Sequence, residues 1–409
     1  MTPRTFTIVG ASLAGATAAA TLRDEGFDGR IVLIGGEERL PYERPGLSKG
    51  FLRGEEQVDD LLVRPPSWYE EQDIDLRLGV MAERLDPSAR SIELSDGDPV
   101  GFDAALIATG ARNRRLPVPG IDLDGVLDLR TVADAETIRR RAADAGRIAV
   151  VGMGFIGAEV SASLRTTGVD VTVVEPFETP MYRALGAQAG QVVAQIHADH
   201  GVKMRLGESV DRFEGDGALR AVVTELGEEI EAQVAVVGVG VQPNAEIWPL
   251  ELAADGGIPV GPDLQSEIPG VFAAGDVASH DHPFFGRIRV EHFDNAIKMG
   301  EAAARNMLGA SRVFDDPHWF WSDQYDVQIQ TVGRADDDAR IVMRGALEDR
   351  SCCWFALNEQ GVLRSATSIA WPRDVRRAIK LVQAQARPDP EALADPGVDL
   401  RTLMPEGGG

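Results

Sequence analysis

Two stretches of the chain share one order of hydrophobic and polar positions: a continuous apolar run, a glycine turn and an alanine-rich segment. The first stretch covers residues 5–34 and the second covers residues 147–175. Continuous Val and Ile runs are typical of strands buried on both faces of a parallel sheet. The segment after each turn favours a helix, and a glycine marks where each helix ends. The pattern therefore predicts two similar strand–turn–helix–strand units.

Further apolar runs predict additional strands at 91–94, 104–108, 221–224, 232–239 and 270–274. Residues 295–308 have apolar positions at helical spacing and predict a helix. From about Pro317 the aromatic residues gather into short strand-like runs, which favours a small α+β domain. The predicted fold class is α/β, with two Rossmann-like dinucleotide-binding domains and a small α+β C-terminal domain.

The net charge and the short apolar runs argue against nucleic acids and membranes as partners. The 409 residues include 65 acidic residues against 41 Lys and Arg, which gives a net charge of −24. Such a chain is a poor general binder of nucleic-acid backbones or anionic membrane surfaces. Its longest apolar runs are far shorter than the roughly 20 residues that span a bilayer, and its first strand begins without a signal-peptide core. We therefore expect a cytoplasmic protein without a nucleic-acid or membrane partner.

The two cysteines, Cys352 and Cys353, are adjacent. This spacing offers neither a disulfide framework nor a zinc site, so no metal is expected. We interpret the pair as half-buried thiols in a strand, and the alternative is a vicinal redox pair.

The first glycine turn is a variant of the dinucleotide fingerprint, with Gly10, Ser12 and Gly15 at its three glycine positions. The first glycine permits a tight turn, the last permits close packing of helix and strand, and the helix N-terminus offers N–H groups to a pyrophosphate. Ser12 stands where the backbone approaches the phosphates most closely, so a purely structural turn is an alternative. The acid that binds the ribose is expected at the end of the second strand, but Gly36 stands there. Glu37, the next residue, is the candidate for that role.

The second turn has the full fingerprint, Gly152, Gly154 and Gly157, with Glu175 at the expected distance of about 20 residues. A carboxylate at that place accepts hydrogen bonds from the ribose hydroxyls and repels a 2′-phosphate, which favours NADH over NADPH. Arg183 is the only nearby cation along the sequence. The alternative is a glycine turn that binds no nucleotide.

Two further turns complete the pattern. Thr109 and Gly110 follow a strand just before the second unit, and Asp276 lies in a turn after a later strand. An Asp in such a turn accepts hydrogen bonds from the ribityl or ribose hydroxyls of a flavin. The four turns in this order predict a flavoprotein with one site for FAD and one for NADH.

Eight short motifs carry a resemblance to a known family; they lie at 10–15, 41–49, 108–110, 129–131, 152–159, 240–244, 275–276 and 320–324. Together they resemble the FAD-dependent, NADH-oxidising ferredoxin reductases of the putidaredoxin reductase and biphenyl dioxygenase type, over essentially the whole chain. The most specific motif is Pro-Tyr-Glu-Arg-Pro-Gly-Leu-Ser-Lys at 41–49. The resemblance implies a glutathione-reductase-like fold, with an FAD domain at 1–109 and 234–315, an NAD domain at 110–233 and a C-terminal domain at 316–409.

The resemblance also implies site residues. It places Lys49 beside the flavin, where an ammonium stabilises negative charge, and pairs Lys49 with Glu159 near the nicotinamide; a surface Lys–Glu pair is the alternative. Structural roles are the alternative for Arg44, Phe293 and Trp321. The FAD set is Gly10, Ser12, Ala14, Gly15, Gly36, Arg44, Lys49, Ala82, Thr109, Gly110, Arg130, Asp276, Phe293 and Trp321. The NAD set is Gly152, Gly154, Ile156, Gly157, Glu159, Glu175, Arg183 and Gly240.

The reaction that the resemblance implies is electron transfer from NADH through FAD to an iron–sulfur ferredoxin, which serves a haem monooxygenase or a ring-hydroxylating dioxygenase. No Cys-x4-Cys lies in the region 45–53, so the dithiol exchange of related disulfide reductases is excluded. The alternatives are a redox-sensing flavoprotein related to apoptosis-inducing factor and an NADH oxidase that uses oxygen. A monomer is favoured.

A docking surface is the last expectation. Ferredoxins are usually acidic, so a chain with a net charge of −24 needs a local basic surface to bind one. We expect this surface before, along and after the helix at 295–308, on Arg287, Arg289, Lys298, Arg305 and Arg312. The alternative is an ordinary solvated face.

Overall fold

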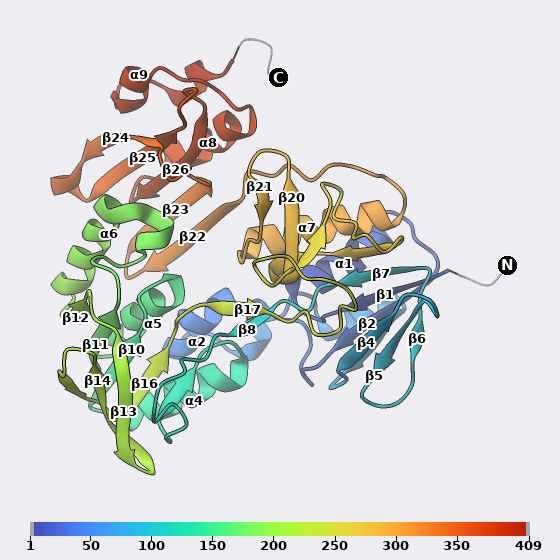
Figure 1. Ribbon diagram of the computed structural model, residues 1–409, viewed down its shortest axis with the longest axis horizontal. Coiled ribbons are helices and arrows are strands. Elements are labelled where there is room, and N and C mark those ends of the chain that lie inside the picture. The colour runs from blue at the N-terminus through green and yellow to red at the C-terminus, as the bar shows by residue number, and fades with distance from the viewer. Residues whose placement is uncertain (1–3, 406–409) are drawn as a thin grey trace. The chain divides into compact units, whose positions relative to one another are not determined.

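The computed structural model describes residues 4–405 (Figure 1). The chain forms two compact units, each made from separate stretches of sequence. The first unit contains the residues up to Glu43, Asp59–Arg112 and Gln242–His318. The second unit contains Arg44–Val58, Asn113–Val241 and the residues from Trp319 onward. The chain crosses between the units within β8 (Ala111–Asn113) and β17 (Val241–Pro243), which pair with each other.

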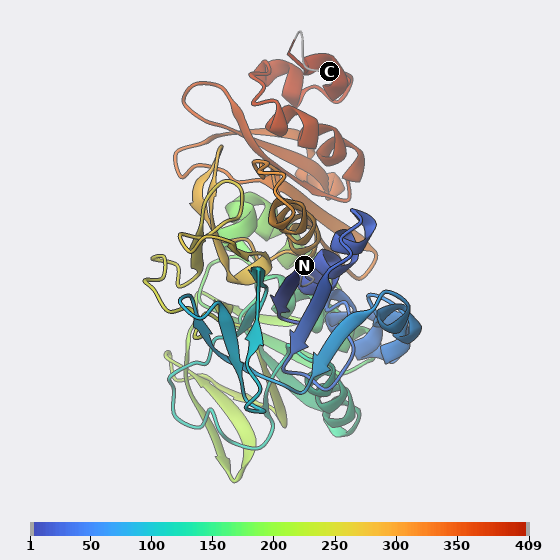
Figure 2. The same cartoon turned by 90° about the vertical axis from the view of Figure 1, so that its right-hand side faces the viewer.

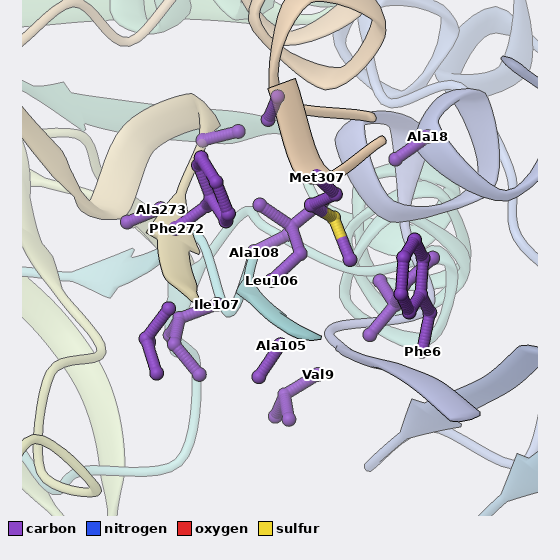
Figure 3. Close-up of a cluster of buried hydrophobic side chains, with 14 of the residues drawn as sticks. Phe6, Val9, Ala18, Ala105, Leu106, Ile107, Ala108, Phe272, Ala273 and Met307 are labelled. Carbon is purple, nitrogen blue, oxygen red and sulfur yellow. The ribbon is translucent and has the colours of Figure 1, made fainter. Parts of the chain in front are cut away.

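The first unit is built on a parallel sheet in which β19, β7, β1, β2 and β3 lie in that order. The apolar runs of its central strands are buried, as both faces of a parallel sheet require. Its core includes Phe6, Ile107, Phe272 and Met307 (Figure 3). The strands are β1 (Thr5–Val9), β2 (Arg30–Gly35), β3 (Ile74–Leu78), β7 (Ala104–Ile107) and β19 (Val271–Ala273).

Helices α1 (Leu13–Asp24) and α7 (Phe293–Met307) pack against each other in this unit. A Cβ atom on Gly300 of α7 would lie 2.5 Å from the backbone oxygen of Ala14, so glycine is needed there. A Cβ atom on Gly275 would lie 3.3 Å from the Cβ of Ala14 and 3.9 Å from the Cβ of Ala296. The first turns of both helices therefore meet at Gly275.

Smaller elements complete the first unit. Strands β4–β6 form an antiparallel sheet, and β20 pairs in parallel with β18 and antiparallel with β21. Helix α7 begins at Phe293, two residues earlier than predicted. The bounds are α3 (Pro66–Glu71), β4 (Ala82–Asp86), β5 (Ser91–Leu94), β6 (Val100–Gly101), β18 (Ile258–Val260), β20 (Ala278–His282) and β21 (Gly286–Ile288).

The second unit contains a second parallel sheet, in which β12, β11, β10, β16 and β9 lie in that order. A three-stranded antiparallel sheet, β13–β14–β15, adjoins its core. The parallel strands are β9 (Val126–Asp128), β10 (Arg147–Val151), β11 (Asp170–Glu175), β12 (Lys203–Leu206) and β16 (Val234–Val237). The antiparallel strands are β13 (Val210–Asp216), β14 (Ala218–Thr224) and β15 (Glu229–Glu231), and the helices are α2 (Gly50–Arg53), α4 (Val132–Asp144), α5 (Phe155–Thr166) and α6 (Tyr182–Asp199).

The C-terminal part of this unit is an antiparallel sheet in the order β22–β23–β26–β25–β24, with α8 packed across β23 and β26 (Figure 2). Arg344 of β24 and Asp374 of α8 form a buried ion pair at 2.8 Å, and Arg344 also donates to the backbone oxygen of Val398. The bounds are β22 (Trp319–Gln324), β23 (Val327–Gly333), β24 (Arg340–Ala346), β25 (Ser351–Leu357), β26 (Leu363–Ile369), α8 (Pro372–Gln383) and α9 (Pro390–Ala394).

The two cysteines lie in β25 as free thiols, and both are fully buried, so the expectation of half-buried thiols is wrong. Neighbouring side chains of a strand point to opposite faces of the sheet. Both cysteines are buried because both faces of β25 are covered. Burial raises the pKa of the Cys352 and Cys353 thiols. Since the thiolate is the reactive form, this burial disfavours a vicinal redox pair.

Candidate active site

The first glycine turn joins β1 to α1. Gly10 has a φ of +115°, and a Cβ atom there would lie 2.0 Å from the backbone oxygen of Ala108. A Cβ atom on Gly15 would lie 2.0 Å from the oxygen of Gly10. Ser12 is the N-cap in an extended conformation, and its side chain makes no capping hydrogen bond. The N–H groups at the start of α1 are therefore left for a ligand such as a pyrophosphate.

The turn at Asp276 lies beside this site. Asp276 follows Gly275, where the first turns of α1 and α7 meet, and its backbone oxygen accepts a hydrogen bond from Arg289 at 3.0 Å. The N-cap of α7, His292, makes no side-chain cap either, and Phe293 is the first residue of the helix. The first turns of α1 and α7 thus meet beside Asp276, and neither N-cap side chain makes a capping hydrogen bond, which fits the phosphates and hydroxyls of a dinucleotide.

Thr109 and Gly110 are bound to Asn244, which the sequence analysis did not assign to the site. The Thr109 hydroxyl donates to the backbone oxygen of Asn244 at 2.6 Å, and the Asn244 amide donates back to the oxygen of Thr109 at 3.1 Å. The backbone N–H of Asn244 also donates to the oxygen of Gly110 at 2.9 Å. Asn244 lies in the motif at 240–244, so the motif itself is the signal that pointed to it.

Gly36 and Ala82 lie near Met81. A Cβ atom on Gly36 would lie 2.3 Å from the sulfur of Met81, whose side chain is exposed. Glu37 accepts a hydrogen bond from the Tyr42 hydroxyl at 2.7 Å. Met81 is an exposed apolar surface beside the end of β2, where the adenosine half of a dinucleotide binds in this type of fold.

The second glycine turn, in the second unit, joins β10 to α5. Gly152 has a φ of +89°, and a Cβ atom on Gly157 would lie 2.0 Å from the oxygen of Gly152. Gly154 caps α5 without a side chain, and no atom lies within 4 Å of where its Cβ would be. This open space above an uncapped helix N-terminus fits a second pyrophosphate.

Glu175 is buried and points at this turn. One carboxylate oxygen accepts the N–H of Met153 at 2.5 Å, and the other accepts the N–H of Phe177 at 3.0 Å. Each carboxylate oxygen has a second lone pair, so ribose hydroxyls can still donate to it. Nearby, the Arg183 guanidinium lies 4.9 Å from the centroid of the Phe177 ring.

Two further members of the NAD set are open to a ligand. Ile156, in the first turn of α5, is exposed, and Gly240 has open space where a Cβ would be. Both lie in the second unit, as do Gly152, Gly154 and Gly157.

Lys49 and Glu159 form an ion pair at 2.5 Å within the second unit. The Ser48 hydroxyl donates to the same Glu159 oxygen at 2.5 Å, and the Ser322 hydroxyl donates to the other at 2.7 Å. Glu159 is 4% exposed and Lys49 is 18% exposed. The alternative of a surface pair is therefore wrong, because the carboxylate is enclosed by partners from two other segments of the chain, Ser48–Lys49 and β22.

Sequence reasoning missed Ser48, Ser322 and the residues behind Ser322. Gln324 donates to the Ser322 oxygen at 3.1 Å, and Gln324 in turn contacts His197 at 2.9 Å. Ser322 and Gln324 alternate with partly buried positions along β22, so they share its buried face. The motif at 320–324 shows no alternation of apolar and polar residues, so the sequence did not indicate which of its side chains are buried.

The remaining FAD candidates of the second unit have partners in that unit. The Arg44 guanidinium donates to the backbone oxygen of Arg130. The Trp321 ring stacks on Trp319, with 5.2 Å between ring centroids, and its N–H donates to Asp323 at 3.1 Å. These contacts fix the positions of Arg44 and Trp321 without a ligand.

Three of the five cations expected to form a docking surface around α7 are paired with acids. The other two, Arg287 and Arg312, are exposed, and the docking surface itself stays a prediction. Lys298 pairs with Asp294 and Asp316, and Arg305 pairs with Glu25 and Glu301. Arg289 pairs with Glu291, and Arg287 donates to backbone oxygens. Three of these acids, Glu291, Asp294 and Glu301, lie within four residues of the cation that they pair with. Only Asp316 and Glu25 lie farther away along the sequence.

Two structural absences apply to the described part of the chain, residues 4–405. No cluster of His, Cys, Asp or Glu within it has the arrangement that holds a metal ion. None of its helices is both long enough and apolar enough to cross a bilayer.

Comparison with known protein families matches two models to the chain. The pyridine nucleotide-disulphide oxidoreductase model matches residues 4–300, and the reductase C-terminal model matches residues 319–404. Together they account for both glycine turns and for the sheet that carries Ser322 and Gln324.

Characterised relatives match over almost the whole chain. Rhodocoxin reductase of Rhodococcus erythropolis is 37% identical over 97% of this chain and 93% of its own length. The ferredoxin–NAD(+) reductase component of the anthranilate 1,2-dioxygenase system of Burkholderia cepacia is 37% identical over 98% of this chain and 99% of its own length. The crystal structure of the ferredoxin reductase for the CYP199A2 system of Rhodopseudomonas palustris has a TM-score of 0.94 at 33% identity, covering 98% of this chain and all of that one.

Proposed function

Because the chain belongs to the pyridine nucleotide-disulphide oxidoreductase family, and within it to the ferredoxin reductases, we propose that it carries electrons from NADH through FAD to an iron–sulfur ferredoxin. The ferredoxin would serve a haem monooxygenase or a ring-hydroxylating dioxygenase. The observation that carries the proposal is the enclosed Lys49–Glu159 pair on the helix of a complete NAD fingerprint.

FAD, when bound, turns a two-electron hydride donor into a source of single electrons, which a cluster needs. The uncapped N-termini of α1 and α7 would donate N–H groups to it, Asp276 would accept from a hydroxyl, and Ser12 has room for a phosphate contact. In the second unit, α5 and Glu175 would hold NADH. The Lys49 ammonium would stabilise the negative charge that develops at the cofactor, and Glu159 would hold Lys49 in place.

A ferredoxin assay tests this function against its alternatives. Under anaerobic conditions, the FAD-loaded protein should reduce an oxidised [2Fe–2S] ferredoxin with NADH as donor. An NADH oxidase would instead consume NADH at the same rate with oxygen alone, and a redox sensor would be reduced once and stop. Either of those two results would reject the proposed function.

Replacement of Glu175 tests the nucleotide preference. Glu175→Ala should raise the KM for NADH about tenfold, because a ribose hydroxyl loses a charged hydrogen-bond acceptor. The KM for NADPH should fall in the same variant, because the carboxylate no longer repels the 2′-phosphate. Steady-state kinetics with both nucleotides measure this, and unchanged KM values for both would remove Glu175 from the ribose site.

The exposed basic side chains of α8 are a better candidate for the ferredoxin docking surface than those around α7. Arg373, Arg376 and Lys380 are exposed at i, i+3 and i+7 of α8 and so lie on one face. No ion pair of these three side chains occurs within residues 4–405, whereas surface cations such as Arg84, Arg147 and Arg220 are paired with acids. In a chain with a net charge of −24, this unpaired basic face suits an acidic ferredoxin.

Charge reversal on α8 tests the docking surface. Arg376→Glu with Lys380→Glu should raise the KM for ferredoxin about tenfold at low salt, and the effect should shrink at high salt because screening shortens the range of the interaction. The control is Arg140→Glu with Lys203→Glu, which makes the same charge change at exposed positions elsewhere. Ferricyanide reduction should stay unchanged in both variants. Equal ferredoxin KM values for the two doubles would place docking elsewhere.

We also propose a cytoplasmic location. The proposed donor, NADH, is an intracellular metabolite, and the two thiols remain unpaired and buried in β25. Free thiols suit a reducing compartment. Fractionation that recovers the protein with the cytoplasmic marker enzymes would support this location, and recovery outside the cytoplasm would reject it.

A further inference from the structure

A buried chain of hydrogen bonds extends from the Glu159 carboxylate through the second unit. Ser322 donates to Glu159 at 2.7 Å, Gln324 lies 3.1 Å from Ser322, and the His197 imidazole lies 2.9 Å from Gln324. The far end is the Tyr325 hydroxyl, 3.3 Å from the other nitrogen of His197. Glu159, Ser322, Gln324 and His197 are all less than 5% exposed.

The direction of every bond in this chain follows from its end at Glu159. An ionised carboxylate only accepts, so the Ser322 hydroxyl must donate to it. The Ser322 oxygen then accepts from the amide N–H of Gln324, which turns the Gln324 oxygen toward His197. His197 must therefore carry its proton on Nε2 and accept from Tyr325 at Nδ1. Burial lowers the pKa of His197 to about 4, so the ring stays neutral at physiological pH and keeps this tautomer.

This series of hydrogen bonds is suited to holding Glu159 in place rather than to moving protons. All four donors point toward the carboxylate, and the Gln324 amide does not readily take up one proton while releasing another. Hydrogen bonds aligned in one direction polarise and strengthen one another. The alignment therefore favours a fixed carboxylate at its end.

Lys49 depends on that carboxylate for its own position. A pocket of about 240 Å³ lies on one side of Lys49 and is lined also by Arg53, Asp323 and Tyr325. The Lys49 ammonium contacts Glu159 at 2.5 Å, the backbone oxygen of Pro45 at 3.3 Å and the Ser48 hydroxyl at 3.5 Å. Glu159 is the only charged group among these three contacts.

We infer that Ser322, Gln324 and His197 are positioning residues for the reaction, which hold the Glu159 carboxylate and, through it, the Lys49 ammonium. This inference rests on the proposed function, in which Lys49 acts on the flavin. The three residues come from β22 and α6, so the C-terminal sheet shapes the reactive centre without touching the substrate.

The test compares two buried serines of one sheet. Ser322→Ala removes the hydrogen bond to Glu159, whereas Ser368→Ala removes a fully buried hydroxyl that has no partner in the described structure. In rapid mixing with NADH, Ser322→Ala should lower the limiting rate of flavin reduction about tenfold, with the dissociation constant for NADH unchanged. Its flavin midpoint potential should fall by about 30 mV, the equivalent of a tenfold change for two electrons. Ser368→Ala should change neither value.

Rescue variants separate positioning from packing. Ser322→Thr keeps the hydroxyl and should restore both the rate and the potential. At the far end, His197→Gln keeps a donor to Gln324 and should behave like wild type, whereas His197→Leu should slow the reduction about threefold. This second pair keeps the test decisive if Ser322→Ala loses FAD.

Two results would overturn the inference: equal rates and potentials for Ser322→Ala and Ser368→Ala, or equal losses for Ser322→Ala and Ser322→Thr. Wild-type protein that NADH does not reduce would instead reject the proposed function itself. The two failures are therefore distinguishable.

Discussion

Lowering the pH from 7 to 4 is expected to unfold the protein, because three buried histidines must gain a charge. His197 and His280 have pKa values lowered from 6.5 to about 4 by burial, and His318 has a pKa lowered to about 2. The unfolded chain therefore binds more protons than the folded chain below pH 6.5. The stability that the neutral buried histidines contribute is present above pH 6.5 and is lost as the pH falls toward their pKa values in the folded protein.

The expected loss is comparable with the stability of a typical protein. Each of these histidines contributes about 3 kcal/mol between pH 7 and pH 4. One such contribution is already a sizeable part of the usual folding free energy of about 5–15 kcal/mol. The contributions of His280 and His318 do not simply add, because their positive charges would repel each other. Denaturant unfolding at pH 7, 5.5 and 4.5 measures the decline.

His318 offers the sharpest variant for this prediction. Both of its ring nitrogens are buried without a partner in the described structure, and its φ of +56° is one that Asn adopts readily. In His318→Asn, unfolding should therefore take up about one proton fewer, so the unfolding free energy should fall less steeply as the pH is lowered. The control is His200→Asn, at an exposed position. If His318→Asn and wild type lose stability in parallel as the pH falls, the account of the buried histidines is wrong.

Removal of the Lys49 charge is expected to have the largest effect on the reaction. Lys49→Met should lower the limiting rate of flavin reduction about 100-fold, because a fixed charge near the developing negative charge is lost. The same variant leaves the Glu159 carboxylate buried without its cation, so the unfolding free energy should fall by about 3 kcal/mol.

The double variant separates these two effects. Lys49→Met with Glu159→Gln removes both charges and should recover most of the stability, while the slow reduction remains. Rapid mixing with NADH and denaturant unfolding of the three proteins provide the measurements. A double variant that regains the wild-type rate would show that Lys49 supports only the fold.

The sequence was informative where the determinants are local. Both parallel sheets follow from continuous apolar runs such as 104–108 and 232–239, and the turns at Gly10 and Gly152 follow from glycine spacing. A tight turn with positive φ leaves few other residues possible, so the glycines are visible without the structure.

The rest depended on contacts between distant residues. Arg305 pairs with Glu25, which is far away in the sequence. Glu159 accepts a hydrogen bond from Ser322, and further hydrogen bonds connect Ser322 to His197. No local pattern encodes such pairs, which explains why the positioning residues were missed. Around α7, by contrast, Asp294 and Glu301 lie one turn from Lys298 and Arg305, so local spacing already indicated part of the pairing there. The full burial of Cys352 and Cys353 likewise follows from a sheet that is covered on both faces, which a single strand does not reveal.

The central claim is that electrons pass from NADH to ferredoxin through a flavin held by this chain, and sequential rapid mixing tests it most directly. Anaerobic mixing with one equivalent of NADH should bleach the flavin absorbance first. A second mixing with oxidised ferredoxin should then restore that absorbance while two ferredoxins are reduced for each NADH, both steps being at least as fast as steady-state turnover. Ferredoxin reduction without prior bleaching, or bleached flavin that ferredoxin does not reoxidise, would contradict the account.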